Sequence, residues 1–186
     1  MDDKQIIALY PARAEEAISE TAAKYGKLCR RIANNILGND QDSEECVNDT
    51  WLNTWNAIPP RRPRKLSAFL GKITRNLSLD RYRRDRAEKR GGGQTAQIFE
   101  ELSDCLPGAD STEAIIEQLA LTELLNRFLS SLTPENRKCF MRRYWYFSSV
   151  SEIARDYGMT ESKVKMSLLR SRNKLRELMD KEGMSI

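Results

Sequence analysis

The residues best suited to chemistry in this chain are cations, and their spacing favours binding of a polyanion. From residue 161 to residue 180, apolar residues recur at helical spacing, and the other positions carry many lysines and arginines. A short helical pattern, Ser151–Tyr157, precedes this segment, and Gly158 follows it where a left-handed backbone is needed. Thr160 can then cap the second helix. This order is that of a helix-turn-helix, whose second helix enters the major groove of DNA.

The first turns of that second helix would carry the residues that face DNA. In such a docking geometry the N-terminal part of the helix meets base edges, and the predicted contacts there are Glu161, Ser162, Lys163 and Met166. Cations elsewhere on the helix suit phosphates, and the predicted contacts are Lys165, Arg170 and Arg172. A charge run alone would favour a helical hairpin with a solvated face. The combination of short helix, glycine, cap and apolar-basic helix favours DNA binding.

A second basic block lies earlier in the chain. Residues 61–90 carry 12 basic and 3 acidic residues, and a helix is predicted from about Ser67. This helix combines an amide with cations, namely Lys72, Arg75, Asn76 and Arg81, and the proline-rich loop before it adds Arg61, Arg62 and Arg64. Such a surface suits binding of an opened DNA strand. A basic helix that is simply exposed to solvent explains the same residues equally well.

The segment between the basic blocks has the opposite charge. Residues 91–126 carry 7 acidic residues and no basic one, and glycines at 91–93 and the Pro107-Gly108 pair interrupt helices. We therefore expect a flexible acidic linker over residues 91–112. Its short apolar patch is expected to dock weakly on a partner, and it consists of Ile98, Phe99, Leu102 and Leu106.

Helical patterns fill the rest of the chain, and strand signals are nearly absent. Helices are predicted over 12–37, from a cap at Asp42, and over 114–132, and a further helix begins with Thr133 as cap and Pro134 in the first turn. The predicted fold is all-α. It has two small helical domains, 1–90 and 113–186, joined by the linker.

The sequence lacks residues that several classes of protein function require. The 186 residues include no histidine, which removes His-based triads and His metal sites. The four cysteines show no CxxC spacing, so we expect reduced thiols that pack in the interior: Cys29, Cys46, Cys105 and Cys139. No apolar run is long enough to span a membrane, and the N-terminus lacks the pattern of a signal peptide. We expect a cytoplasmic protein without catalytic residues, metal or cofactor.

Three segments together resemble a known family. They are Asp42–Leu52, an acidic helix, then Phe69–Arg84, the basic helix, and Leu132–Leu178, which includes Ser-Glu-Ile-Ala and Val-Lys-x-x-Leu-x-Arg-x-Arg. In this order and spacing the chain resembles a bacterial RNA polymerase sigma factor of the sigma-70 family, in the small two-domain extracytoplasmic-function group. The resemblance implies a protein that binds core polymerase and directs it to promoters to initiate transcription.

The resemblance also assigns roles to residues and partners. It implies that an acidic face docks on the clamp coiled coil of polymerase, and these residues are Asp42, Glu44, Glu45, Asn48 and Asp49. It places the minus-ten promoter element against Arg61, Arg62, Arg64, Lys72, Arg75, Asn76 and Arg81. It places the minus-thirty-five element against the helix-turn-helix residues named above. The polymerase flap and an anti-sigma factor are further implied partners.

Two other readings remain open from the residues. A stand-alone helix-turn-helix regulator would explain residues 133–181 but not the acidic helix at 42–52. A DNA-acting enzyme such as a recombinase would need a nucleophile or a cluster of metal-binding carboxylates. Asp80 and Asp85 lie among arginines and are expected to form local ion pairs instead.

Overall fold

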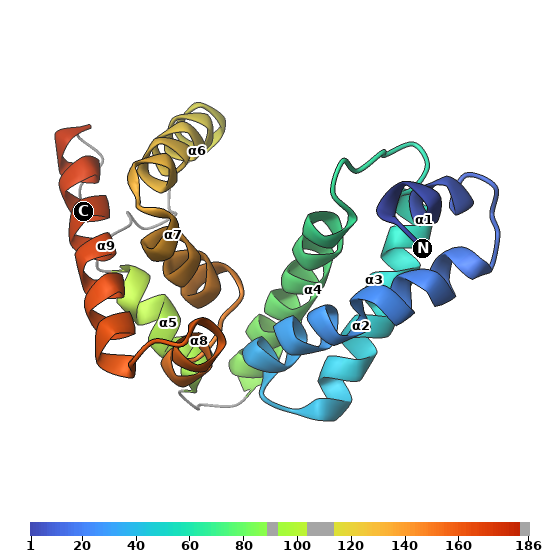
Figure 1. The fold of residues 1–186 in the computed structure, drawn as a ribbon, viewed down its shortest axis with the longest axis horizontal. Helices are drawn as coiled ribbons and strands as arrows, with labels where there is room; N and C mark the ends of the chain where they lie inside the picture. The colour runs from blue at the N-terminus through green and yellow to red at the C-terminus, as the bar shows by residue number, and fades with distance from the viewer. Residues whose placement is uncertain (89–92, 104–113, 183–186) are drawn as a thin grey trace. The chain divides into compact units, whose positions relative to one another are not determined.

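Two separate helical units make up the chain (Figure 1). The structure is a computed structural model, and it describes residues 1–88, 93–103 and 114–182. The first unit is Met1–Gly91 and the second is Gly92–Ile186. The described residues contain no strand, which agrees with the predicted all-α fold.

The N-terminal unit is a bundle of three long helices and one short one. Helices α2 (Glu16–Leu37), α3 (Asp40–Ala57) and α4 (Leu66–Glu88) pack pairwise, and α1 (Asp3–Leu9) lies against α2 (Figure 1). The helix predicted over 12–37 thus begins later, at Glu16, because the preceding residues turn, with Arg13 at a positive φ of 52°.

The start of α3 differs from the prediction. Gly38 ends α2 in the left-handed region at a φ of 73°, so the chain turns at once and the next helix begins at Asp40. Asn39, not Asp42, is the N-cap, and its side chain accepts a hydrogen bond of 2.8 Å from the Asp42 amide. Asp42 lies in the first turn, where its negative charge suits the helix dipole.

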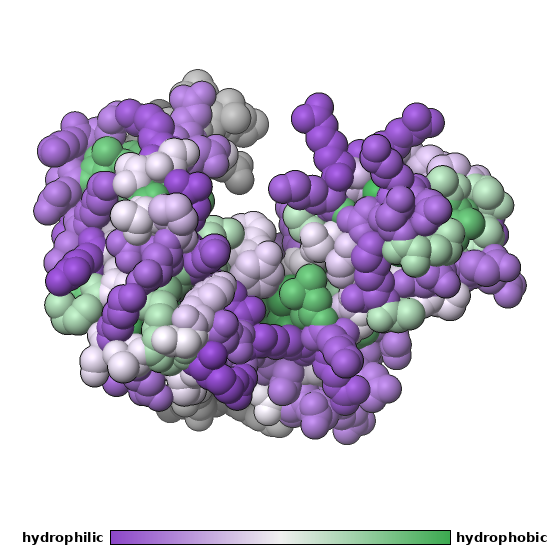
Figure 2. All heavy atoms as spheres, in the orientation of Figure 1, coloured by the Kyte–Doolittle hydropathy of each residue, from purple (hydrophilic) through white to green (hydrophobic). Residues whose placement is uncertain are grey.

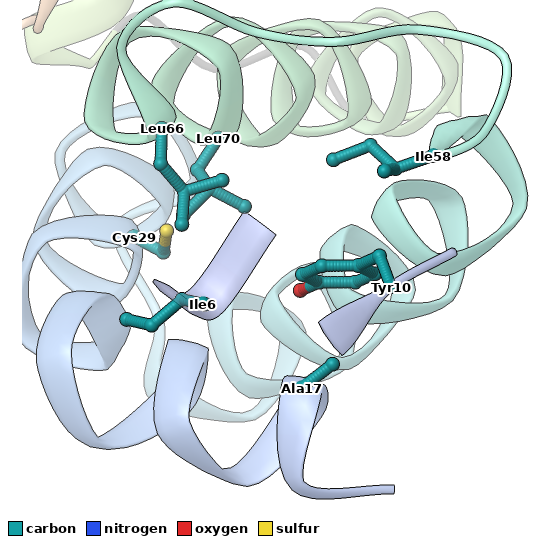
Figure 3. Packing of buried hydrophobic residues seen from close by; sticks show 7 residues of the cluster. All are labelled: Ile6, Tyr10, Ala17, Cys29, Ile58, Leu66 and Leu70. Atoms are coloured by element: carbon teal, nitrogen blue, oxygen red, sulfur yellow. The ribbon is translucent and has the colours of Figure 1, made fainter. Parts of the chain in front are cut away.

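The core of this unit gathers side chains from all four helices. Figure 3 shows them converging, with Ile6 of α1 facing Leu66 and Leu70 of α4, and with Tyr10 near the α3 end residue Ile58. Each of these side chains is almost fully buried. Burial of this kind contributes about 1.5–3 kcal/mol per large apolar side chain. The core therefore fixes α4 against α1, α2 and α3.

Small hydroxyl residues fill the contact between α3 and α4. The Oγ1 atoms of Thr50 and Thr74 lie 3.1 Å apart, and both residues are fully buried. Each hydroxyl donates to the carbonyl four residues before it, at 2.8 and 2.9 Å. Because their side chains are small and satisfied, the two helix backbones can approach closely. This contact ties the acidic helix to the basic helix.

The C-terminal unit packs short helices around one long one. Helix α9 (Glu161–Lys181) lies against α6 (Ala114–Ser131), α7 (Pro134–Phe140) and α8 (Val150–Tyr157) (Figure 1). A π-helical turn, η1 (Met141–Trp145), continues α7. Thr133 caps α7 and Pro134 stands in its first turn, as predicted. The rings of Phe128 and Phe140 meet edge to face at 5.0 Å in the core.

The segment predicted to be a linker contains a helix. Helix α5 (Gln94–Ser103) belongs to the C-terminal unit, where it contacts η1. Its residue Ile98 is fully buried, and the ring of Phe99 lies 5.6 Å from that of Phe147. The apolar patch therefore packs within this chain instead of remaining open for a partner. Leu106 lies outside the described residues.

The described cysteines are interior packing residues, as predicted. Cys29, Cys46 and Cys139 are buried free thiols. Burial raises the pKa of each thiol, so each is held in the uncharged form that packs as a small apolar group. Cys105 lies outside the described residues.

Figure 2 shows hydrophilic side chains over most of the visible face of each unit, with hydrophobic residues in small areas. Within the part of the chain that the structure describes, no helix combines the length and apolar character that crossing a membrane requires. The same residues contain no group of three or more candidate metal ligands.

Candidate nucleic-acid interface

The acidic face predicted on α3 is present. Glu44, Glu45, Asn48 and Asp49 are all exposed, and Asp42 is half-buried. Beside them an open groove of about 310 Å³ runs between α2 and α3. Its lining combines apolar and polar side chains, namely Ala22, Gly26, Lys27, Arg30, Glu44, Val47, Asn48 and Trp51. The exposed Leu52 adds an apolar residue to the same helix.

Arg81 of α4 contacts this acidic face. Its guanidinium donates to Asp42 at 2.5 Å and to Glu45 at 2.6 Å, so one cation joins two carboxylates of α3. The hydrogen bond to Glu45, together with the negative charges, raises the pKa of Arg81. The sequence assigned Arg81 to DNA and the two acids to polymerase. In the free chain the structure brings these three residues together.

The other predicted minus-ten residues form a cationic surface on α4 and its preceding loop. Lys72 and Asn76 lie one turn apart and are exposed, as are Arg61, Arg62 and Arg64. Arg75 is half-buried, and burial together with the charge of Arg83 lowers its pKa. Asp80 pairs with Arg83 at 3.5 Å, which confirms the predicted local ion pair for that aspartate.

The helix-turn-helix has the local geometry that the sequence predicted. Gly158 ends α8 in the left-handed region at a φ of 62°, and the Thr160 hydroxyl accepts a 3.2 Å hydrogen bond from the Lys163 amide. Ser149 caps α8 in a capping box with Glu152. These three signals fix where α8 begins and ends and where α9 begins.

One side of α9 presents most of the predicted upstream contacts. Glu161, Ser162, Lys163, Lys165, Met166 and Arg170 are exposed. An open groove of about 360 Å³ lies along this side, and α7 lines it with Glu135 and Asn136. Glu135 pairs with Lys163 at 2.8 Å, and the Ser167 hydroxyl donates to Asn136 at 2.7 Å. Two contacts therefore hold the start of α7 against α9.

Arg172, a predicted phosphate contact, has partners within its own unit in the structure. Its side chain is only 22% exposed, and its Nη1 donates to the Tyr144 hydroxyl at 2.6 Å. The same nitrogen lies 3.5 Å from a carboxylate oxygen of Glu101. Arg172 thus faces the interior of its unit and α5.

Buried Arg143 and half-buried Glu101 form an ion pair that the sequence alone did not reveal. Arg143 is 2% exposed and donates to both carboxylate oxygens of Glu101, at 2.6 and 3.2 Å. Burial acts to raise the pKa of Glu101, but the hydrogen bonds and charge of Arg143 outweigh it and hold that pKa below its usual value. The available signal was the position of Arg143 within the aromatic run 140–147. Such a run indicates burial, and a buried cation requires an acidic partner.

Comparison with known proteins covers both units. The family described as Sigma-70 region 2 matches residues 21–88, and the family described as Sigma-70, region 4 matches residues 122–175. The chain is 26% identical over 187 residues to the ECF RNA polymerase sigma factor SigE of Mycolicibacterium smegmatis, covering 98% of this chain and 70% of that protein.

Two further similarities span most of the chain. The ECF RNA polymerase sigma factor SigL of Mycobacterium tuberculosis is 26% identical over 160 residues, which is 84% of this chain and 86% of that protein. A solved structure, CnrH in complex with the cytosolic domain of CnrY, aligns with 22% identity and a TM-score of 0.45, covering 96% and 97% of the two chains.

Proposed function

Because this chain belongs to the extracytoplasmic-function group of the sigma-70 family of RNA polymerase sigma factors, which direct core polymerase to promoters, we propose the surfaces through which it does so. The exposed acidic face of α3 docks on the clamp coiled coil of polymerase. The cationic surface of α4 and its loop binds the minus-ten element, and the exposed side of α9 binds the minus-thirty-five element. These steps take place in the cytoplasm.

The observation that carries this assignment is the separation of charge by element. The α3 surface offers carboxylates beside an apolar groove, which suits a protein partner better than a polyanion. The exposed cations of α4 and α9 lie on different units, so one chain can contact two separate stretches of DNA. On the α4 surface the exposed amide of Asn76 can hydrogen-bond a base edge. The exposed ammonium group of Lys72, one turn away, can contact a phosphate.

Energetics explain why polymerase is required. Opening duplex DNA costs about 1.4 kcal/mol per base-pair step, and extruding a base costs a few kcal/mol more. A small chain with exposed cations gains mainly salt-dependent phosphate contacts. The isolated chain should therefore bind duplex DNA weakly, and specific opening should require polymerase to hold both units on one promoter. The flap of polymerase and an anti-sigma factor complete the proposed partners.

Run-off transcription tests this proposal directly. Core bacterial polymerase is incubated with the chain and a pool of templates with randomised promoters, and the transcribed templates are sequenced. We expect transcripts only when the chain is present, and enrichment of two conserved blocks separated by a fixed spacing. Transcripts that do not depend on the chain, or a single enriched block, would contradict the proposal.

Replacing Lys165 tests the phosphate contacts of α9. Each phosphate that the protein neutralises contributes about 0.9 to the magnitude of the slope of log K against log salt. Lys165→Ala should therefore reduce the magnitude of that slope by about 0.9, and by the same amount for every duplex sequence tested. Lys181→Ala is the matched control, since it removes the same charge about 24 Å farther along the helix. An equal loss of slope in both variants would show that α9 does not bind DNA with its N-terminal end toward the duplex.

A further inference from the structure

Two large apolar side chains are exposed on the side of α9 that carries the predicted upstream contacts. Met166 is 46% exposed and Leu169 is 41% exposed. The same helix buries Val164, Leu168 and Leu175 almost completely. Because residues three apart share one face of a helix, Met166 and Leu169 together form an apolar strip on the surface of α9.

The apolar strip points away from the core of its unit. Successive residues turn by about 100° around a helix, so Met166 lies about 160° around the axis from both Val164 and Leu168. A single exposed apolar residue is common on protein surfaces and needs no explanation. This strip is different, because it lies on a surface whose other exposed groups suit a polyanion.

Cationic side chains flank the apolar strip. Lys165 is exposed beside Met166, and Arg170 lines the same open groove as Met166 and Ser162. An apolar protein segment placed on the strip would draw these cations out of water, at a cost in free energy. The major groove of DNA instead offers phosphates on its borders and apolar methyl groups on its floor. The combination of charge and apolar surface therefore favours DNA as the occupant.

This part of α9 has few side chains that read bases through paired hydrogen bonds. Such readers are chiefly arginine, lysine, asparagine and glutamine, and residues 161–169 contain no arginine, asparagine or glutamine. Lys163 places its ammonium group 2.8 Å from Glu135. Lys165 has its ammonium group 3.9 Å from Glu161. Both lysines thus have acidic neighbours, whereas the apolar strip is open to a contact with DNA.

We propose that Met166 reads the C5-methyl group of a thymine in the minus-thirty-five element, and that Leu169 contacts the neighbouring base pair. This inference rests on the proposed function, because it requires the first turns of α9 to lie in the major groove at that element. Thymine alone among the four bases presents a methyl group there. Residues three apart on a recognition helix can meet successive base pairs.

The proposed contact gives the chain a preference for A·T pairs that does not depend on hydrogen bonds. A methionine suits this role because its unbranched, polarizable side chain adapts to the shape of the surface that it covers. Contact with the methyl group removes apolar surface of both partners from water. Loss of one methyl group from such a contact should weaken binding about fourfold.

Deoxyuridine tests the contact, because it differs from thymidine only by that methyl group. Holoenzyme assembled from core polymerase and the full-length chain is titrated with the promoter enriched in the run-off experiment, and each thymine of the upstream block is replaced in turn. We expect one or two positions at which the replacement weakens binding about fourfold. An upstream block without A·T pairs, or binding that no replacement weakens, overturns the inference.

Replacements of Met166 assign the effect to this residue. Met166→Gln keeps the length of the side chain but makes its end polar, so the holoenzyme should no longer distinguish thymine from deoxyuridine at the sensitive position. Met166→Leu is the matched control, because it keeps an apolar side chain and should retain the difference. Both changes place good helix formers at an exposed helical position, which preserves the fold. A fourfold difference that persists in Met166→Gln overturns the inference.

The same experiment tests the second half of the apolar strip. Leu169→Gln should abolish the difference between thymine and deoxyuridine at the base pair next to the one that Met166 reads, and should leave the Met166 position unchanged. Loss of the difference at both positions in Leu169→Gln would contradict separate contacts with two base pairs.

Failure of this inference is distinguishable from failure of the proposed function. If the holoenzyme enriches two promoter blocks but binds thymine and deoxyuridine equally, the proposed function stands and the role of Met166 is wrong. If no template is transcribed in the presence of the chain, the proposed function is wrong and the inference falls with it.

Discussion

Replacing Asp49 with lysine is expected to weaken binding of core RNA polymerase about a hundredfold, which corresponds to about 2.7 kcal/mol. Asp49 is exposed on the acidic face of α3, and the described residues include no salt bridge to it. The change removes an attraction and places a like charge against the basic surface expected on the clamp. Juxtaposed like charges at an interface cost several kcal/mol.

Binding of a fluorescently labelled chain to core polymerase measures this effect, and the transcript yield should fall in parallel. Glu16→Lys is the matched control, because it makes the same reversal at an exposed site on α2. Duplex DNA binding by the free Asp49→Lys chain should be unchanged or slightly stronger. Equal affinity of the unmodified chain and Asp49→Lys for polymerase would remove α3 from the docking surface.

Asp49 is a better test of docking than Glu45, although the sequence assigned both residues to polymerase. Glu45 accepts a hydrogen bond from Arg81, so reversing its charge would also break the connection between α3 and α4. Loss of polymerase binding in a Glu45 variant would then have two explanations. The structure thus separates an acid with an internal partner from an acid on the open surface.

Local signals in the sequence were sufficient to predict most helices and the helix-turn-helix. Gly158, Thr160 and Pro134 act within one turn of themselves, through positive φ, a cap and a fixed first turn. The same kind of signal misplaced the start of α3, because Asn39 and Asp42 are both good caps. The left-handed Gly38 decided between them.

Pairing between distant residues could not be predicted from the pattern. Arg81 and Arg172 stand in basic runs that indicate a solvated or DNA-binding face, yet their partners lie 36–39 and 28 positions away. Glu101 and Arg143 are likewise separated by 42 positions. Charge counting treated the acidic segment as a spacer, whereas burial of Ile98 and a specific carboxylate position make its first half a packed helix.

Truncating Phe128 to alanine is expected to destabilise the C-terminal unit by about 4 kcal/mol. Phe128 is fully buried, and its ring packs on Phe140, which in turn contacts the ring of Tyr144 at 4.6 Å. Removing it leaves a cavity between α6 and α7, in a small unit whose total stability is only about 5–15 kcal/mol. Calorimetry should show one unfolding transition lowered by about 15–30 °C.

The transition of the N-terminal unit should stay where it is, because Phe128 belongs to the other unit. Phe128→Leu is the control, since it keeps most of the volume and should cost less than about 1.5 kcal/mol. Above the lowered transition, Phe128→Ala should still bind core polymerase through α3 and yet gain nothing from a minus-thirty-five element. If both transitions moved together, the two units would be one cooperative structure, and separate contacts with two stretches of a promoter would need another explanation.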